Sequence, residues 1–505
     1  MKKSPTKAIH HLPDLARTVD ARRARLCADL DSARQRRLGQ FLTTAPVAAH
    51  MASLLRGTRK TVRILEPGAG VGSLVAAVAL ELSARSKRPE RLEVTAVEVD
   101  SHFIPSLRRT LSDCKSHCAE YGIDFGFQVI QEDFIEFASL ALNHQLAFDA
   151  PDTQEYDLVI LNPPYRKLAS SSRERHALRR IGIEVGNLYA AFLALSAKLL
   201  SPTGELVAIT PRSFCNGPYF RAFRKLLLEL VSFSDVHVIE SRSEAFAEDG
   251  VLQENVIFRA QRGVKRLSVM VTAGNGSLDS KKRGRRIPYA DFVSPRDPDA
   301  FIHIAPDSEG VDVAARIQRL PCELADLGVA VSTGRVVDFR AKRFLRRNPA
   351  SGTAPLVYPA HFEAGFIQWP RETRKPNAIL IDEATAGLLV PEGVYVVVKR
   401  FSAKEERRRI VAAVFDPARV EAGSGVGFEN HLNYYHLNGR GLERHFALGL
   451  GAYLNSTLVD AFFRQFSGHT QVNAADLRKL RYPSASTLSH LGREISEAFP
   501  DQARQ

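Results

Sequence analysis

Residues 62–73 read VRILEPGAGVGS, and this stretch decides the fold class of the chain. The segment VRIL suits a short buried strand, Gly68 and Gly70 fall in the turn that follows, and residues 74–84 carry apolar side chains at helical spacing. Glycine lets the backbone of such a turn approach a ligand closely, and the first N–H groups of the helix are free to bind it. The stretch therefore predicts a strand, a ligand-binding turn and a helix.

Strands and helices alternate from this stretch as far as residue 258. Further strands are predicted at 94–97, 127–130, 157–161, 206–210, 236–239 and 254–258, with helices at 187–200 and 218–230. This alternation predicts an α/β fold, with a parallel sheet that helices cover on both faces. Ligands bind such sheets at the carboxyl ends of the strands, so the polar residues at those ends form the candidate site.

An acidic residue follows each of the first three strands. Glu66 lies in the glycine turn, where it would repel a phosphate and attract a cation, and the turn lacks the Lys-Ser/Thr of a phosphate-binding loop. Glu98 could accept hydrogen bonds from both hydroxyls of a ribose, and Asp133 from the amino group of an adenine that rests against Phe134. These residues predict a pocket for a positively charged adenosine derivative, and S-adenosylmethionine fits it.

The fourth strand ends in Asn162-Pro163-Pro164-Tyr165. The two prolines fix the turn and offer no N–H, so the Asn162 amide oxygen and the Pro163 carbonyl form a rigid pair of acceptors. Two such acceptors suit an NH2 group on an aromatic ring, and Tyr165 is placed to stack on that ring. Accepting both N–H bonds localises the nitrogen lone pair, which can then attack a methyl sulfonium in line. The predicted catalytic residues are Asn162, Pro163, Pro164 and Tyr165.

In this order the motifs resemble those of the gamma-class adenine-N6 DNA methyltransferases of type II restriction–modification systems, the Asn-Pro-Pro-Tyr family of Eco57I- and TaqI-like methylases. The resemblance extends to residues 39–46 (GQFLTTAP), 186–192 (GNLYAAF) and 210–214 (TPRSF). It implies a Rossmann-like, S-adenosylmethionine-dependent catalytic sheet with a separate, mixed α+β target-recognition domain after it. It also implies that Thr43 contacts the methionine end of the cofactor and that Phe192 packs on its adenine.

Methyltransferases of this kind flip the target adenine out of the duplex and stack it between two aromatic side chains. The resemblance assigns these roles to Tyr165 and Phe246, with Phe214 as the alternative to Phe246. Residues 467–473 (SGHTQVN) resemble the target-recognition part of related methylases. His469, Gln471 and Asn473 are therefore expected to read base edges.

The chain has 505 residues, which suits two or three domains, and a net charge of +13 that is unevenly distributed. Residues 1–38 hold ten basic and four acidic residues and 259–287 hold nine and one, whereas 39–258 carry a net charge of −3. We therefore expect a basic N-terminal arm (1–38), a catalytic domain (39–260), a basic linker (261–299) and a DNA-binding recognition domain (300–505). The recognition domain is expected to contain strands at 329–337, 379–382 and 394–399 and a helix at 443–464. The expected DNA contacts are Lys281, Lys282, Arg283, Arg285, Arg286, Arg343, Arg346 and Arg347.

Composition and motifs also exclude other classes of protein. Five scattered cysteines do not make a disulfide framework, and Cys114 and Cys118 lack a second pair of ligands for zinc, so no metal site is expected. The N-terminus lacks the apolar region of a secretory signal, and no apolar run is long enough to span a membrane. We expect a cytoplasmic monomer that acts on double-stranded DNA and is paired functionally with a cognate restriction endonuclease.

Two rival functions stay open from the sequence. Methylation of cytosine N4 in DNA, or of adenine in RNA, uses an exocyclic amine in the same way. The second rival is a DNA-binding protein with an inactive methyltransferase fold, although such a protein would not need an intact Asn-Pro-Pro-Tyr motif and Glu66.

Overall fold

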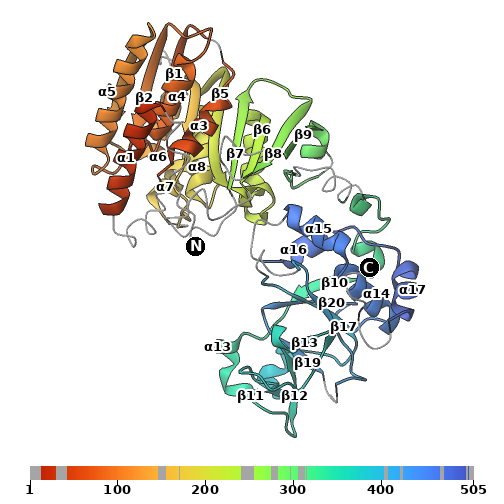
Figure 1. Ribbon diagram of the computed structural model, residues 1–505. Coiled ribbons are helices and arrows are strands. Elements are labelled where there is room, and N and C mark those ends of the chain that lie inside the picture. The colour runs from red at the N-terminus through yellow and green to blue at the C-terminus, as the bar shows by residue number, and fades with distance from the viewer. Residues whose placement is uncertain are drawn as a thin grey trace, which may run out of the picture. The chain divides into compact units, whose positions relative to one another are not determined.

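The chain folds into two compact units, Met1–Asp307 and Ser308–Gln505, each with its own hydrophobic core (Figure 1). The computed structural model describes residues 13–29, 42–57, 59–145, 155–169, 171–239, 255–274, 283–295, 297–304, 313, 316–402, 408–420, 425–466, 471–495 and 499.

The N-terminal unit is built on a nine-stranded sheet with the order β3-β2-β1-β4-β5-β7-β6-β8-β9. The strands are β1 (Thr61–Pro67), β2 (Arg91–Val97), β3 (Asp124–Ile130), β4 (Tyr156–Leu161), β5 (Leu200–Pro211), β6 (Val231–Ile239), β7 (Asn255–Arg262), β8 (Ser268–Gly274) and β9 (Arg283–Pro288). Strands β1 to β5 are parallel, as predicted. The prediction is wrong for β7 and β9, because β7 runs antiparallel to both β5 and β6, and β9 to β8, whereas β6 and β8 are parallel to each other. Strands β6 and β7 are neighbours in sequence and in the sheet, and an antiparallel pair of this kind needs no crossover helix.

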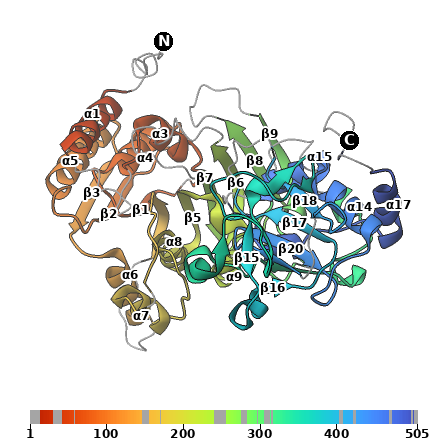
Figure 2. The same ribbon diagram turned by 90° about the horizontal axis from the view of Figure 1, so that it is seen from below.

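Helices cover both faces of this sheet (Figure 2). One face packs on α1 (Asp14–Asp29), α3 (Ala45–Ser53), α4 (Ser73–Ser83) and α5 (Ile104–Glu120). The other face packs on α6 (Phe134–Gln145), α7 (Arg173–Arg180), α8 (Leu188–Lys198) and α9 (Arg221–Leu230). All residues of β4 are buried. Leu158 and Ile160 pack on the face that α1, α3, α4 and α5 cover, and Val159 and Leu161 pack on the opposite face. A strand buried on both faces reads as a continuous apolar run, which is why β4 was predictable.

The predicted N-terminal arm contains a docked helix. Val19 of α1 is buried, and Arg22 donates hydrogen bonds to the Thr110 hydroxyl (2.6 Å) and to the Asp113 carboxylate (2.8 Å) of α5. Arg22 therefore helps to hold α1 against α5. The rest of the predicted arm, residues 1–12 and 30–38, lies outside the described residues.

The predicted linker, residues 261–299, is also part of the N-terminal unit. Strands β8 and β9 extend the sheet to its edge, with Val269, Val271 and Ala273 buried. Basic side chains are well suited to an edge strand because they face solvent and discourage pairing with other chains, so a high positive charge does not by itself indicate a linker. The segment after β9 is also attached, since Arg224 donates to the Asp299 carbonyl and the Ile302 N–H donates to the Cys215 carbonyl. The unit consequently ends at Asp307, after the predicted boundary at 300.

The C-terminal unit contains a six-stranded sheet, β10-β20-β17-β18-β14-β13, and a five-stranded sheet, β11-β15-β12-β19-β16. Val396 and Val398 of the first sheet pack on helices, whereas Tyr395 and Val397 pack on Phe428 of the second. The strands are β10 (Ala330–Thr333), β11 (Leu345–Arg346), β12 (Thr353–Val357), β13 (Phe362–Glu363), β14 (Phe366–Ile367), β15 (Ala378–Leu380), β16 (Leu389–Val390), β17 (Tyr395–Lys399), β18 (Ala412–Phe415), β19 (Val426–Phe428) and β20 (Leu432–His436).

The helix predicted at 443–464 is two helices, α14 (Arg444–Leu454) and α15 (Thr457–Phe466). The break falls at Asn455, whose side-chain amide bonds the backbone N–H and C=O of Ala412 in β18, at 2.9 Å each. The remaining helices are α11 (Tyr289–Phe292), α13 (Asp338–Ala341), α16 (Ala474–Arg478) and α17 (Ala485–Arg493), with 3-10 turns at Arg212–Cys215, Pro218–Phe220, Ala325–Leu327, Lys342–Phe344, Pro359–His361 and Glu383–Leu388. Within the described ranges, no single helix has both the length and the hydropathy to cross a membrane, although the bent pair of α14 and α15 does by length and composition.

Candidate functional site

The glycine turn between β1 and α4 has the backbone conformation that its sequence predicts. Gly68, Gly70 and Gly72 have φ angles of +67°, +55° and +82°, which favour glycine. The N–H groups of Gly68 and Ala69 donate to the Val97 carbonyl, at 2.8 and 3.0 Å, and hold the turn against the end of β2. A Cβ on Gly70 would lie 2.7 Å from the Leu42 Cδ2 atom, so a side chain there would require the Leu42 side chain to move.

Glu98 lies at this turn, as predicted. Its two carboxylate oxygens accept hydrogen bonds from the Gly70 N–H (2.7 Å) and the Asp100 N–H (2.8 Å). Burial raises the pKa of Glu98, because the ionised form loses its water. Each oxygen keeps a second lone pair, so the carboxylate can still accept from a ligand.

Glu66 is more deeply enclosed than its predicted role requires, with only 2% of its surface exposed. Burial raises its pKa well above the ordinary value, and the backbone N–H groups of Val75 and Leu74 at the start of α4 partly oppose this rise. Its Oε2 atom has no hydrogen-bond partner among the described residues. The carboxyl therefore lies close to the first turn of α4, and its contact with a cofactor stays a prediction.

Asp133 and Phe134 follow β3. The Asp133 carboxylate accepts from the N–H groups of Ile135 (2.8 Å) and Glu136 (3.3 Å), so it caps α6, and burial raises its pKa. The Phe134 ring packs on the Phe192 ring, with 4.8 Å between centroids, and a Cβ on Gly68 would lie 3.5 Å from Phe192. The structure thus brings Phe134, Phe192 and the glycine turn together as one wall of the site.

Asn162 stands at the end of β4 between two hydroxyl groups. Its Nδ2 donates to the Thr43 Oγ1 at 3.0 Å, and its Oδ1 accepts from the Tyr165 hydroxyl at 3.2 Å. The Tyr165 hydroxyl also lies 3.4 Å from the Ile209 carbonyl of β5, and burial raises its pKa, so it is a neutral donor. Thr43, predicted to contact the cofactor, therefore also contacts the predicted catalytic asparagine.

The structure also contains a set of contacts that supports the Tyr165 segment, which we call the brace, and which the sequence did not predict. The segment after Tyr165 pairs with the segment before α8, since the Leu168 N–H donates to the Gly186 carbonyl (2.9 Å) and the Leu188 N–H to the Arg166 carbonyl (2.7 Å). The Tyr189 ring meets the Tyr165 ring edge-on at 6.3 Å, and its hydroxyl pairs with that of Ser213 at 2.9 Å. The only sequence signal for this brace was the recurrence of the GNLYAAF and TPRSF segments in the resemblance.

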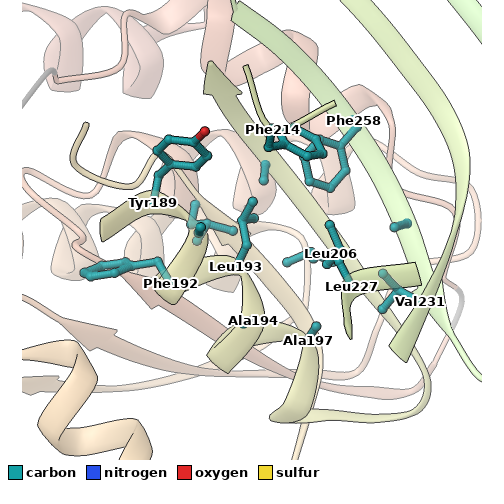
Figure 3. Packing of buried hydrophobic residues seen from close by; sticks show 14 of the residues in the cluster. Tyr189, Phe192, Leu193, Ala194, Ala197, Leu206, Phe214, Leu227, Val231 and Phe258 are labelled. Carbon is teal, nitrogen blue, oxygen red and sulfur yellow. The ribbon is translucent and has the colours of Figure 1, made fainter. Parts of the chain in front are cut away.

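Phe214, the alternative base-stacking residue, belongs to the hydrophobic core. It is 1% exposed and packs on Phe223 and Phe258, as Figure 3 shows for Phe258. A side chain enclosed in this way cannot stack on a flipped base without unpacking the core, so the structure contradicts this alternative. The other predicted stacking residue, Phe246, lies outside the described residues, as do Lys281, Lys282 and His469.

The predicted DNA contacts of β9 lie on the edge of the sheet. Arg283, Arg285 and Arg286 are strand residues rather than linker residues, and Arg286 donates to the Ser268 hydroxyl at 3.3 Å. The edge position leaves this strand without a neighbour on its outer side in the described sheet.

The predicted contacts of the C-terminal unit have different surroundings. Arg343 and Arg347 are exposed, whereas Arg346 donates to the carbonyls of Arg343 and Leu345, at 2.9 Å each. Asn473 caps α16 in a reciprocal pair with Asp476, and Gln471 forms a β-bridge with Phe401. These contacts give Asn473 and Gln471 a structural role in addition to any role toward DNA.

No metal centre is found in the part of the chain that the structure describes. It contains no group of three or more His, Cys, Asp or Glu side chains that could hold an ion. Cys114 and Cys118 are buried free thiols, and burial raises the pKa of both.

Comparison with known proteins identifies the family. The Eco57I restriction-modification methylase family matches residues 89–246. The chain is 41% identical over 493 residues to the type II methyltransferase M.PstI of Providencia stuartii, covering 97% of this chain and 96% of that protein. It is 44% identical over 461 residues to the type II methyltransferase M.BsuBI of Bacillus subtilis, covering 91% of this chain and 90% of that protein. The chain belongs to the type II methyltransferases of restriction–modification systems.

A solved structure, that of the type IIG restriction endonuclease BpuSI, is similar to this type II methyltransferase with a TM-score of 0.46 and 14% identity. The match covers 95% of this methyltransferase and 63% of that chain.

Proposed function

We propose that this type II methyltransferase transfers a methyl group from S-adenosylmethionine to the N6 amine of a specific adenine in double-stranded DNA. The observation that carries this proposal is the Asn162 amide at the end of β4, which is held between Thr43 and Tyr165 and followed by two prolines. We expect the enzyme to be a cytoplasmic monomer that protects DNA from a cognate endonuclease.

The residues around the glycine turn fit an adenosine-based cation. The turn presents backbone rather than side chains, and Glu98 retains acceptor capacity beside it. Oε2 of Glu66 is buried and has no hydrogen-bond partner in the described part of the chain. Glu98 would bind the ribose, Phe192 and Phe134 would border the adenine, and Asp133 would accept from its amino group. When bound, S-adenosylmethionine supplies a methyl group on a cationic sulfur.

The neighbours of Asn162 explain how the target amine would be held. Its Nδ2 end is occupied by Thr43, so its Oδ1 end is the one that can accept from the amine, together with the Pro163 carbonyl. The amine would replace the Tyr165 hydroxyl as the donor to Oδ1, while the Tyr165 ring stacks on the flipped adenine. Two acceptors on the amine keep its lone pair directed toward the methyl group.

Mass spectrometry of DNA from cells that express the protein tests the proposal. N6-methyladenine should accumulate with the native sequence and with Asn143→Ala, a control at an exposed position of α6. Asn162→Ala should abolish it and leave S-adenosylmethionine binding largely intact, because it removes an acceptor used in transfer. N4-methylcytosine in the DNA would show that the substrate is cytosine, and methylated RNA with unmethylated DNA would show that the substrate is RNA. No methylated base, despite tight cofactor binding, would favour the inactive-fold alternative.

A further inference from the structure

The positive charge of the C-terminal unit is concentrated in two segments, 338–347 and 369–377, which we call the basic face. They hold eight Lys and Arg residues and two acidic residues, whereas the other residues of 308–505 hold 18 basic and 19 acidic residues. The first segment contains α13 and β11 (Figure 1), and the second directly precedes β15, which pairs with β11 in the five-stranded sheet. The fold thus gathers an excess of charge that the rest of the unit lacks.

Asn377 fixes the backbones of the two segments against each other. Its Nδ2 donates to the carbonyls of Arg347 and Arg371, at 3.0 Å each. Its Oδ1 accepts from the Arg371 N–H at 2.9 Å and pairs with the His361 ring at 3.0 Å. All four hydrogen-bonding positions of this buried amide are used, so the segments cannot shift apart without leaving a buried polar group unpaired.

Asp338 provides a second anchor. One carboxylate oxygen accepts from the Tyr358 hydroxyl at 2.7 Å and the other from the Lys375 ammonium at 2.8 Å. The first residue of α13 is therefore held from both sides, and its charge is compensated by Lys375. The rest of the basic face keeps its excess of positive charge.

Five cations of the basic face have no acidic partner among the residues that the structure describes. Each is exposed, and none donates a side-chain hydrogen bond or forms an ion pair with another described residue. Two of them stack on aromatic rings, Arg340 at 5.5 Å from the Phe339 centroid and Arg343 at 4.5 Å from that of Phe344. The five are Arg340, Lys342, Arg343, Arg347 and Arg374.

Phe339 is an exposed aromatic residue within the basic face. Its side chain is 77% exposed, although it follows the anchored Asp338 in α13. An aromatic ring left in water on a fixed backbone, with Arg340, Lys342 and Arg343 following it in the sequence, has the composition of a nucleic-acid contact, because the cations suit phosphates and the ring suits bases.

We propose that the basic face is a DNA-contacting surface of the C-terminal unit, on which the five free cations bind phosphates and Phe339 inserts against the base pairs. The inference rests on the proposed function and adds a location and a division of labour to it. The cations would supply affinity for any sequence, whereas the Phe339 ring would discriminate, because unstacking a base step costs less in some sequences than in others.

The charge component is tested by binding of the full chain to two duplexes over a range of salt concentrations. One duplex carries the site mapped by methylation-sensitive sequencing of the expressing host, and the other a scrambled site. Replacing Arg347 and Arg374 together by Gln should weaken binding to both duplexes and flatten the slope of log K against log salt by about 1.8, or about 0.9 for each lost phosphate contact. The control Arg493→Gln, at an exposed cation of α17, should leave the slope unchanged.

The ring is tested by Phe339→Ala in the same assay. Affinity for the specific duplex should fall about tenfold or more, from the loss of a base–aromatic contact, with the scrambled duplex and the salt slope little changed. Leu491→Ala, at an exposed apolar position of α17, is the control. Equal effects of Phe339→Ala on both duplexes would contradict the insertion of Phe339. If the arginine variants bind DNA as tightly as the native protein does, the basic face does not contact DNA, and a protein would be its partner instead. Failure of the proposed function is separate, since it would show as host DNA without methylated bases.

Discussion

At the scale of single residues, the two ends of the Asn162 amide have different neighbours. The Nδ2 end donates to Thr43, 119 positions earlier in the chain, and the Oδ1 end accepts from the Tyr165 hydroxyl. An amide held at its donor end presents its oxygen in one direction, which is the condition for accepting from a substrate amine. Thr43 is therefore a candidate positioning residue, in addition to its predicted contact with the cofactor.

Removing the Thr43 hydroxyl should lower turnover. Thr43→Val keeps the shape of the side chain but leaves Nδ2 of Asn162 without an acceptor, and one hydrogen bond is worth about 0.5–1.5 kcal/mol, so kcat should fall up to about tenfold. Thr43→Ser should restore it. Steady-state kinetics with separate kcat and KM for S-adenosylmethionine decide the matter, because a purely cofactor-binding role would raise KM and leave kcat unchanged.

Cofactor affinity should depend on pH through Glu98. Burial raises the pKa of this carboxyl in the free protein, whereas hydroxyl donors and a nearby cation favour its ionised form. Binding should therefore lower the pKa and release a proton, and affinity should rise with pH until the pH exceeds the raised pKa of the free protein.

Calorimetric titration in buffers of different ionisation enthalpy measures this proton release. Glu98→Gln should lower the number of protons released, and S-adenosylhomocysteine, which lacks the sulfonium charge, should show a weaker dependence on pH. An affinity that is independent of pH between the ordinary glutamate pKa and neutrality would contradict the role of Glu98.

At the scale of elements, the edge of the large sheet is formed by strands that the charge pattern led us to predict as a linker. Strand β9 pairs with β8 over six residue pairs, from Ser268↔Pro288 to Ala273↔Arg283. Gly284 faces Thr272 so closely that a Cβ would lie 2.5 Å from the Thr272 Cγ2. A linker would not constrain a glycine in this way.

Gly284→Val should accordingly destabilise the N-terminal unit. The added methyl groups overlap Thr272 and the Val271 carbonyl, and overpacking of this kind costs about 1–3 kcal/mol. Urea denaturation gives the change in free energy of unfolding. Gly387→Ala, where a Cβ meets no atom within 4 Å, is the control, and equal stabilities of the two variants would mean that 283–288 is not held in the sheet.

At the scale of the whole molecule, the predicted methyl-transfer site and the basic face lie in different units. The predicted cofactor and amine-binding residues all belong to Met1–Asp307, and the basic face belongs to Ser308–Gln505. Each unit has its own core, so each can respond separately to a ligand.

Calorimetric unfolding should show this division. S-adenosylhomocysteine at one hundred times its Kd should stabilise the N-terminal unit by about 2.7 kcal/mol, and should therefore raise the temperature of one transition and leave the other in place. The Glu98→Gln variant supplies the control, since it should show a smaller shift. A single transition that moves as a whole would show that the two units unfold together.

The strands and turns of the catalytic half follow from local sequence patterns. Strands β1 to β4, the glycine turn and the Asn-Pro-Pro-Tyr turn are local signals, because an apolar run, a positive φ angle or a proline ring acts through immediate neighbours. The order of these motifs was also enough to predict the family, which the relatives confirm.

The contacts between distant residues, in contrast, depend on how the whole chain folds. It places β8 and β9 in the sheet, Phe214 in the core, Thr43 on Asn162, and Asn377 between the two halves of the basic face. None of these contacts follows from local pattern, because a hydrogen bond or a packing contact between remote segments forms only after the chain has closed the loop between them. The same polar or basic residue also suits a linker, an edge strand or a buried hydrogen bond equally well, and only its neighbours in the folded protein distinguish these positions.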